Sequence, residues 1–276
     1  MDNRGQGSFE YVLMIAGVVL VLTVIVVVLQ NQAVGSSQAV EQNVEHHEQV
    51  ACDAGKMREL ASSLILSWGF NEGKGVVAKD SSGGGNDGNL LPATGGPKWV
   101  VGRFRKALEF DGRNDYVEIP VLLSPTEAIT VSAWVKSADS MGYSGIWQIV
   151  SKYDAFILGN SGGGSDMCFI VYTAGLSWAD YTNCFTVSDP QNWHHFAGTY
   201  DSSTNEQKLF VDGVLRSTKT VTGTINPDSG PLHVAHRELN SPGDFHFEGS
   251  VDEVKIYDRA LSQEEVLSDM NCGLLS

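Results

Sequence analysis

An uncharged, strongly apolar stretch near the N-terminus constrains the fold of this chain more than any other feature. From Tyr11 to Leu29 no residue carries a charge, and only Thr23 and the tyrosine hydroxyl are polar. At about 1.5 Å of rise per residue, a helix of this length spans roughly the 30 Å of a membrane's hydrocarbon core. The stretch therefore predicts a transmembrane helix, to which we assign residues 6–30.

The residues around this stretch argue against an ordinary secretory signal. Such a signal has several basic residues, an apolar run of about 7–15 residues, and small residues at a cleavage point behind the run. Here the run is longer and no A-x-A sequence follows it, while the cleavable-looking site, Gly5–Gln6, comes before it. Glu10 stands at the leading edge of the run, where a carboxylate costs about 3 kcal/mol unless it is paired or reaches the lipid headgroups.

The string QGSFEY at residues 6–11, with its five-residue leader MDNRG, resembles the class III signal peptide of archaeal type IV pilins. The resemblance implies that a prepilin peptidase cuts between Gly5 and Gln6 and leaves the apolar helix on the mature protein. It also implies that Glu10 of one subunit meets the new amino terminus, at Gln6, of a neighbouring pilin subunit in the filament. The alternative is a plain signal anchor whose Glu10 lies among the headgroups.

The distribution of charge sets the orientation and excludes some partners. The formal net charge is −15, and all but one of the 18 Lys and Arg residues lie at or beyond Lys56. The exception, Arg4, precedes the apolar stretch and favours an orientation with the N-terminus inside and the rest of the chain outside. An acidic exterior argues against nucleic acid and anionic lipid surfaces as partners of the outer part.

The composition changes twice after the apolar stretch. Residues 31–58 are polar, rich in Gln and Glu and free of proline, which predicts a helical stalk. From Leu64 to about Tyr257, short runs of Val, Ile, Phe, Tyr and Trp alternate with turns rich in Gly, Asn, Asp and Ser, which predicts an antiparallel β-sandwich. Ser262 and Glu265 then form a capping box, which predicts a helix in the C-terminal segment, residues 263–276.

We expect twelve strands in this sandwich, at residues 64–70, 107–110, 116–119, 129–136, 147–152, 168–172, 184–186, 194–200, 207–211, 214–221, 232–236 and 251–257. Asp212-Gly213 between two of these runs is a strong signal for a tight hairpin turn. The adjacent residues His194 and His195 suggest a chemical role, but neighbouring residues of a strand point to opposite faces of its sheet. We therefore expect the two histidines to have structural roles.

Seven blocks of the outer part appear in the order seen in laminin-G-like, concanavalin A-like jelly rolls. They are LILSWGFNEGKG, KDSSGGGNDGNL, ALEFDGRNDYVEIP, AITVSAWVK, NWHHFAGTYD, KLFVDGVL and GSVDEVKIYDRALSQEEV. The chain resembles that family from about Leu64 to Val266, which implies a jelly-roll domain over residues 59–262. Large side chains at alternating positions are expected to fill its interior, namely Trp68, Phe70, Phe110, Trp134, Phe196, Phe210 and Ile256.

The resemblance also implies a structural Ca²⁺ ion. Its ligands would be Asp80, Asp87 and Asp252, which fall at the matching positions of the N-terminal loop and the last strand. Oxygen ligands of this kind suit a hard cation. The alternative is that these residues only shape turns, because Asp favours such loops without a metal.

The four cysteines lie in the part predicted to be outside, and none has the C-x-x-C spacing of a metal or redox site. Three pairings are possible. Cys168 and Cys184 lie in neighbouring apolar runs that could pair as strands, while Cys52 and Cys272 bracket the domain, so we favour these two disulfides. Four free thiols are the alternative, which is disfavoured outside a cell.

No string in the sequence indicates catalysis. The E-x-D-x-x-E strand of glycosidases with this fold is absent, as are G-x-S-x-G and zinc-binding spacings. We therefore predict that the protein is not an enzyme and has no catalytic residues. Instead the sequence predicts a pilin-like subunit or adhesin with a lectin-like head that binds a glycan or a surface protein.

The predicted location is the cell membrane before assembly and an extracellular surface filament afterwards, with the head outside the cell. One alternative is a membrane-anchored surface lectin that does not polymerise. A less favoured alternative is a glycoside hydrolase.

Overall fold

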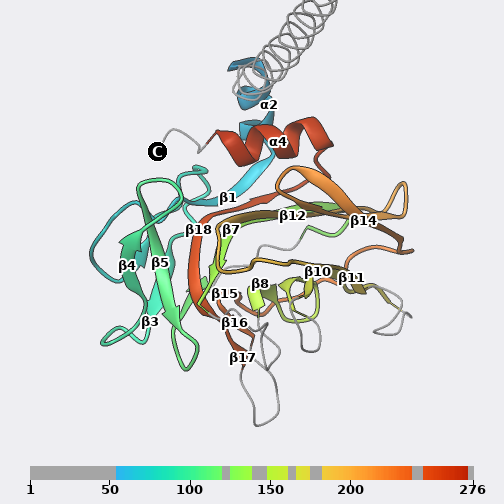
Figure 1. Ribbon diagram of the computed structural model, residues 1–276. Helices are drawn as coiled ribbons and strands as arrows, with labels where there is room; N and C mark the ends of the chain where they lie inside the picture. Colours follow the sequence, from blue (N-terminus) through green and yellow to red (C-terminus); the bar gives the residue numbers. More distant parts are fainter. Residues whose placement is uncertain are drawn as a thin grey trace, which may run out of the picture. The chain divides into compact units, whose positions relative to one another are not determined.

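The computed structural model describes residues 54–119, 125–138, 148–160, 166–174, 182–237 and 245–272. All of them belong to one compact unit that spans Ala51–Ser276. Two antiparallel β-sheets packed face to face make up most of this unit, with a two-stranded ribbon and two short helices in its described part (Figure 1). The prediction of a mainly β, antiparallel sandwich is therefore confirmed.

Several predicted features lie outside the described residues. They are the leader, the transmembrane helix and most of the stalk, with Gly5, Gln6, Glu10 and Cys52. Within the ranges given above, neither helix is long and apolar enough to cross a membrane.

The first sheet has β18 near its centre. In chain order its strands are β1 (Leu64–Trp68), β4 (Lys98–Val101), β5 (Lys106–Asp111), β7 (Ala128–Ser137), β12 (His194–Asp201), β13 (Glu206–Val211), β14 (Val214–Thr220) and β18 (Glu248–Tyr257). Across the sheet the order is β14-β13-β12-β7-β18-β5-β4, and β1 pairs with β18 beyond the end of β5. As a result, the last strand of the domain is held by β1, β5 and β7 together.

The second sheet lies against the first. Its strands are β2 (Val77–Ala78), β3 (Gly88–Leu91), β6 (Tyr116–Ile119), β8 (Gln148–Lys152), β9 (Phe156–Gly159), β10 (Asp166–Val171), β11 (Thr182–Thr186) and β15 (Leu232–Val234). The order across this sheet is β11-β10-β9-β8-β15-β6-β3-β2. A separate ribbon pairs β16 (His236–Arg237) with β17 (Phe245–His246).

The predicted strand over residues 232–236 is wrong in one respect. Ala235 adopts a left-handed backbone conformation with φ of 65°, which breaks the run into β15 and β16. Such a conformation costs a residue with a Cβ atom free energy and redirects the chain. The chain therefore leaves the second sheet at Ala235 and enters the ribbon. The sequence does not predict the short strands β2, β3, β4, β9 and β17.

The interior between the two sheets is apolar, and five of the seven predicted core side chains lie in it, namely Trp68, Phe70, Phe110, Phe196 and Ile256. The prediction is wrong for Trp134 and Phe210. Ala133 and Val135 on either side of Trp134 point into the main core, so Trp134 points to the other face of the sheet. There its indole Nε1 donates a hydrogen bond to the carbonyl oxygen of Met270, at 3.3 Å.

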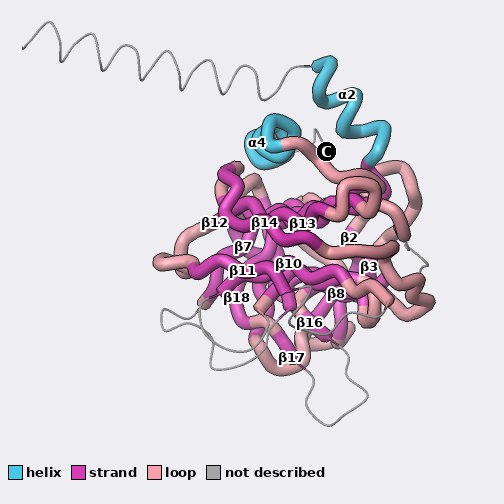
Figure 2. The backbone as a smooth tube through the Cα atoms, turned by 90° about the vertical axis from the view of Figure 1, so that its right-hand side faces the viewer, coloured by secondary structure: helices cyan, strands magenta, loops and turns pink. Residues whose placement is uncertain are grey.

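Both helices cover that other face of the first sheet (Figure 2). They are α2 (Ala54–Ser63), which crosses the boundary expected at residue 59, and α4 (Gln263–Asn271). A second apolar cluster of Leu60, Ala197, Phe210, Tyr257, Leu261 and Val266 lies between the helices and the sheet. The capping box of Ser262 and Glu265 begins α4 as predicted.

The predicted hairpin at Asp212-Gly213 supports α4. Both residues have positive φ angles, 52° and 72°, as a tight turn between twisted strands requires. A Cβ atom on Gly213 would lie 2.3 Å from Cδ2 of Leu267, so only glycine allows α4 to pack this closely on the turn.

The predicted disulfide between Cys168 and Cys184 is confirmed. The two residues lie directly opposite each other on β10 and β11, with their Cα atoms 4.0 Å apart. Cys272 at the end of α4 is also disulfide-bonded. Its predicted partner, Cys52, lies outside the described residues, so that pairing stays a prediction.

Candidate functional site

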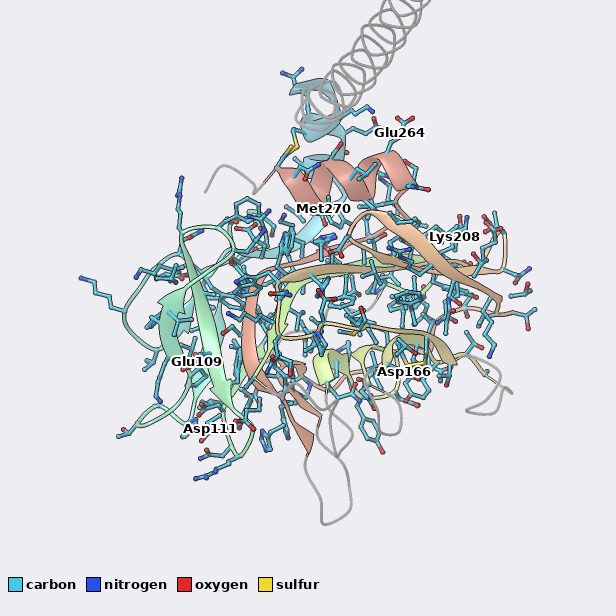
Figure 3. The ribbon with its side chains drawn as sticks, viewed as in Figure 1. Glu109, Asp111, Asp166, Lys208, Glu264 and Met270 are labelled. Carbon is cyan, nitrogen blue, oxygen red and sulfur yellow. A yellow bond between two sulfur atoms is a disulfide. The ribbon has the colours of Figure 1, made fainter. Side chains whose placement is uncertain are left out.

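A pocket of about 480 Å³ lies where β5 turns into β6 at one end of the sandwich. Its volume falls within the range of about 300–1,000 Å³ that is usual for small-ligand sites. Two of its lining residues, Glu109 and Asp111, lie on β5 and are labelled in Figure 3. The lining comes from β4, β5, the β5–β6 turn and the region where β7 ends and β18 begins, and consists of Lys98, Glu109, Phe110, Asp111, Arg113, Asp115, Ala138, Glu248 and Gly249.

Two carboxylates hold the β5–β6 turn in shape. Asp111 accepts a hydrogen bond from the backbone N–H of Arg113 at 2.9 Å, and its own N–H donates to Oδ2 of Asp115 at 3.1 Å. Gly112 has φ of 71°, and a Cβ atom there would lie 2.8 Å from Cβ of Glu248. Glycine is needed because the turn has a left-handed conformation and β18 passes close to it.

Asp115 lines this pocket with a buried carboxylate. The side chain of Asp115 is almost fully buried, with 2% of its surface exposed, and its Oδ1 accepts no hydrogen bond within the described part of the chain. A buried carboxylate oxygen without a donor is costly, because desolvation is not compensated. Asp115 therefore keeps the capacity to accept a hydrogen bond from a hydroxyl or an N–H group.

The pKa values of the two aspartates in the turn are shifted in opposite directions. Burial raises the pKa of Asp115 and the nearby charge of Asp111 raises it further, while Lys98 and His246 partly offset the rise. Burial also acts to raise the pKa of Asp111, but the N–H groups of Arg113 and Asn114 outweigh it, so this pKa is lowered. Asp111 is thus the ionised member, and Asp115 is the carboxyl that takes up a proton more readily.

A group of aromatic rings lies beside the pocket. The rings of His236 and His246 are stacked with centroids 4.6 Å apart, and His233 and Tyr116 each lie 4.8 Å from His236. Nε2 of His233 lies 3.3 Å from Oε2 of Glu118. Nowhere in the described ranges do three or more His, Cys, Asp or Glu side chains form a group that could hold a metal ion, so these rings are not a metal centre there.

Two of the predicted calcium ligands, Asp80 and Asp87, share one hydrogen-bond network. Asp80 accepts hydrogen bonds from the N–H groups of Ser67, Ser82 and Asn86, at 2.9–3.0 Å. Its own N–H donates to Asp87, whose pKa is lowered mainly by the hydrogen bond from Lys79.

Asp252 is buried and accepts hydrogen bonds from the N–H groups of Phe104 and Glu253. All three carboxylates thus accept hydrogen bonds from N–H or ammonium donors, which leaves the calcium prediction untested. Calcium binding stays a prediction.

The two histidines of the Trp193-His194-His195 string point to opposite faces, as expected. His194 lies 2.8 Å from Oδ2 of Asp212, and that hydrogen bond raises the pKa of His194. Nε2 of His195 lies 3.2 Å from Oδ2 of Asp269 on α4. Both rings are engaged by carboxylates that fix a turn or a helix.

Comparison with known families fits this architecture. Residues 111–267, more than half of the chain, match the model of the concanavalin A-like lectin/glucanases superfamily, and the chain belongs to that superfamily. Residues 3–29 match the class III signal peptide. The protein thus joins a class III signal peptide to a lectin-like jelly-roll domain.

Curated relatives cover the domain but are far longer. Sushi, von Willebrand factor type A, EGF and pentraxin domain-containing protein 1 of Rattus norvegicus is 28% identical over 174 residues. The counterpart of Mus musculus is 27% identical over 172 residues. The match covers 60% and 59% of this chain but 5% of each relative, so the similarity concerns a single domain of a much longer protein.

Solved structures with this fold include binding modules of larger proteins. Domain 4 of AbnA, a GH43 extracellular arabinanase from Geobacillus stearothermophilus in complex with arabinotriose, has a TM-score of 0.57 at 17% identity, covering 75% of this chain and 98% of that one. The binding domain of Paraclostridial Mosquitocidal Protein 1 has a TM-score of 0.56 at 18% identity, covering 75% and 52%. The binding domain of botulinum neurotoxin DC with rat synaptotagmin II has a TM-score of 0.58 at 14% identity, covering 77% and 52%. At these identities the likeness shows the fold.

The sequence did not predict any pocket residue as part of a site. The block ALEFDGRNDYVEIP contains Glu109, Asp111, Arg113 and Asp115, but it was interpreted only as a signature of the fold. Two aspartates around Gly-Arg-Asn between two strands predict a tight turn lined with acids, which is the one signal that could have pointed to the pocket. Lys98 and Glu248 come from distant segments and gave no signal.

Proposed function

We propose that this protein is a pilin-like surface subunit whose lectin-like head binds a neutral glycan in the pocket at the β5–β6 turn. The observation that carries the proposal is the presence of a class III signal peptide and a concanavalin A-like domain in one chain. The signal peptide supports cleavage by a prepilin peptidase and a head outside the cell. A head much larger than its helix favours a minor or tip position in a filament.

The mature N-terminus tests the first half of this proposal. We expect the protein isolated from membranes or filaments to begin at Gln6, because the class III signal directs cleavage after Gly5. Mass spectrometry of the N-terminal peptide measures this directly. A mature protein that still begins at Met1 would contradict the pilin route and favour the membrane-anchored lectin that does not polymerise.

The chemistry of the pocket supports a neutral sugar as the ligand. Oδ1 of Asp115 has no donor among the described residues, and a sugar hydroxyl can supply one while its own oxygen accepts from Lys98 or Arg113. Four acidic side chains against two basic ones disfavour sialic and uronic acids, since like charges repel. The AbnA domain is in complex with arabinotriose, which supports the view that this fold can present a sugar site.

Replacement of Asp115 by asparagine tests the pocket. We expect the full-length variant in detergent to bind neutral oligosaccharides at least about tenfold more weakly than the wild type, because a hydrogen bond to a charged group contributes about 1.5–3 kcal/mol. A glycan array followed by titration calorimetry measures the loss.

Asp166→Asn is the matched control, since Asp166 lies on β10 well away from Asp111 (Figure 3) and should leave binding unchanged. Equal binding by wild type and Asp115→Asn, or binding of acidic glycans alone, would contradict the assignment. Failure of the wild type to bind any glycan would favour a surface protein as the ligand.

A further inference from the structure

A buried charged cluster lies between α4 and the first sheet, on the far side of the sheet from the main core. Lys255 of β18 is 1% exposed, and its Nζ lies 3.1 Å from Oδ1 of Asp269 on α4. Oε2 of Glu253, also buried, lies 3.3 Å from the same Nζ. An amine and two carboxylates therefore meet in a place that water does not reach.

A bulge in β18 brings these groups to one face. Glu253 has φ of 49°, and the pairing of β18 with β7 shifts register between Asp252 and Lys255. Because of the extra residue, Val251, Val254 and Ile256 all point into the main core, while Lys255 and Tyr257 point towards α4. A left-handed glutamate is strained, and such strain concentrates at functional sites.

Two further side chains contact the carboxylate of Asp269. The hydroxyl of Tyr257 donates a hydrogen bond to Oδ1 at 2.7 Å, and Nε2 of His195 lies 3.2 Å from Oδ2. Each oxygen of this carboxylate is thus held by a separate protein group, which keeps the carboxyl group beside Nζ. Because both side chains are held by other contacts, little further ordering is needed to bring Nζ to the carboxyl carbon.

The charges of the cluster do not balance. Two buried carboxylates face one ammonium group, and each buried ion has a desolvation cost that pairing only partly offsets. Burial opposes both charges of the pair, but mutual attraction outweighs it, lowering the pKa of Asp269 and raising that of Lys255. The pair is therefore ionised at first, and joining its members as a neutral amide would remove two charges from the protein interior.

We propose that Lys255 and Asp269 condense into an intramolecular isopeptide bond that joins β18 to α4. The ammonium group of Lys255 gives up a proton, and the neutral Nζ attacks the carboxyl carbon of Asp269. A C–N bond forms, a C–O bond breaks, and one oxygen leaves with two hydrogens as water. Ammonium and carboxylate thus become amide and water, with no oxidant, reductant or other reactant.

The surrounding side chains supply what this step needs. Glu253 is the base that accepts, one after the other, the two protons that Nζ loses, and both end on the departing oxygen, which leaves as water. The Tyr257 hydroxyl stabilises the negative charge that develops on Oδ1 when Nζ attacks. His195 faces Oδ2, the oxygen that leaves as water. Together they form a complete set of reacting and catalytic groups within one buried cluster.

The position of the bond gives it a mechanical consequence. Cys272, at the end of α4, is disulfide-bonded, so force applied through that disulfide enters α4. An amide between Asp269 and Lys255 would pass this force covalently into β18, which is held by three neighbouring strands. The bond would form in the folded chain whether or not the chain enters a filament.

Intact-mass measurement of the reduced, full-length protein tests the bond. We expect the wild type to be lighter by one water molecule than its processed sequence, and trypsin to release a branched peptide that joins β18 to α4 through Lys255. A wild-type mass without this loss, or a branch at another residue, would overturn the proposal.

The variant Glu253→Gln separates loss of the base from loss of the fold, because glutamine keeps the size of the side chain but cannot accept the proton. We expect at least a tenfold fall in the crosslinked fraction, with an unchanged circular dichroism spectrum. Glu264→Gln, a change to an exposed side chain of α4, should leave the protein fully crosslinked. A fully crosslinked Glu253→Gln protein would overturn the role of Glu253 as the base.

Discussion

Replacement of Glu10 by glutamine is expected to leave the protein inserted in the membrane and to abolish its incorporation into filaments. The change removes a charge from the edge of the apolar helix, so insertion becomes no harder. It also removes the carboxylate that we expect to pair with the amino group of Gln6 on the neighbouring subunit. Loss of one member of a buried charge pair costs about 3–5 kcal/mol, which corresponds to a fall of more than about a hundredfold in the equilibrium constant for subunit association. Quantitative immunoblots of sheared filaments and membranes measure the distribution.

The control for this experiment is Glu45→Gln, which makes the same chemical change in the predicted stalk. We expect Glu45→Gln to assemble normally and both variants to begin at Gln6, which separates a defect in assembly from a defect in processing. Normal filaments from Glu10→Gln would show that the carboxylate has no role in subunit pairing.

The sandwich could be predicted from the sequence because its strands follow the period of two that a pleated sheet imposes. The same period could not say which face of a strand is the core. Trp134 and Phe210 were placed in the main core, yet both lie under the helices, because the first sheet is covered on both of its faces. In a sheet that is buried on both sides, apolar residues occupy odd and even positions of a strand alike. Only the docking of α4 then shows which of these residues face the main core and which face the helices.

The pocket and the buried charged cluster are harder to predict from the sequence than the fold, because each combines residues from distant segments. The pocket joins Lys98, the β5–β6 turn and Glu248, which are far apart along the chain. The contact between Lys255 and Asp269 depends on the bulge at Glu253, which reverses the face that Lys255 would otherwise take. Local patterns specify turns and strands, whereas these sites depend on register and on long-range packing. The Cys168–Cys184 disulfide was predictable because its two strands are neighbours in the chain.

The stability of the head is expected to fall as the pH rises from about 4 to 7, in the absence of metal. Asp252 on β18 is fully buried, and desolvation raises its pKa to about 7, against about 3.9 for an unfolded aspartate. Between these values the unfolded chain releases the proton first, so each step up in pH favours unfolding; above about 7 the effect is complete. A difference of about 3 pKa units corresponds to about 4 kcal/mol.

The variant Asp252→Asn should remove this part of the pH dependence, because asparagine resembles the protonated acid. It keeps one oxygen to accept a hydrogen bond from Phe104 or Glu253, but its amide nitrogen then faces the other N–H group. We therefore expect the variant to match the wild type near pH 4 and to be more stable by a few kcal/mol near pH 8. Denaturant unfolding in EDTA across this range measures both curves.

The same experiment with added Ca²⁺ tests the calcium prediction. If Asp252 is a calcium ligand, the ion should restore the stability of the wild type near pH 8 and leave Asp252→Asn unchanged, because binding to the native state alone stabilises it. Equal responses of the two proteins to Ca²⁺ would show that Asp252 does not bind the ion. Parallel curves for the two proteins in EDTA would instead show that the buried carboxyl does not titrate between pH 4 and 7.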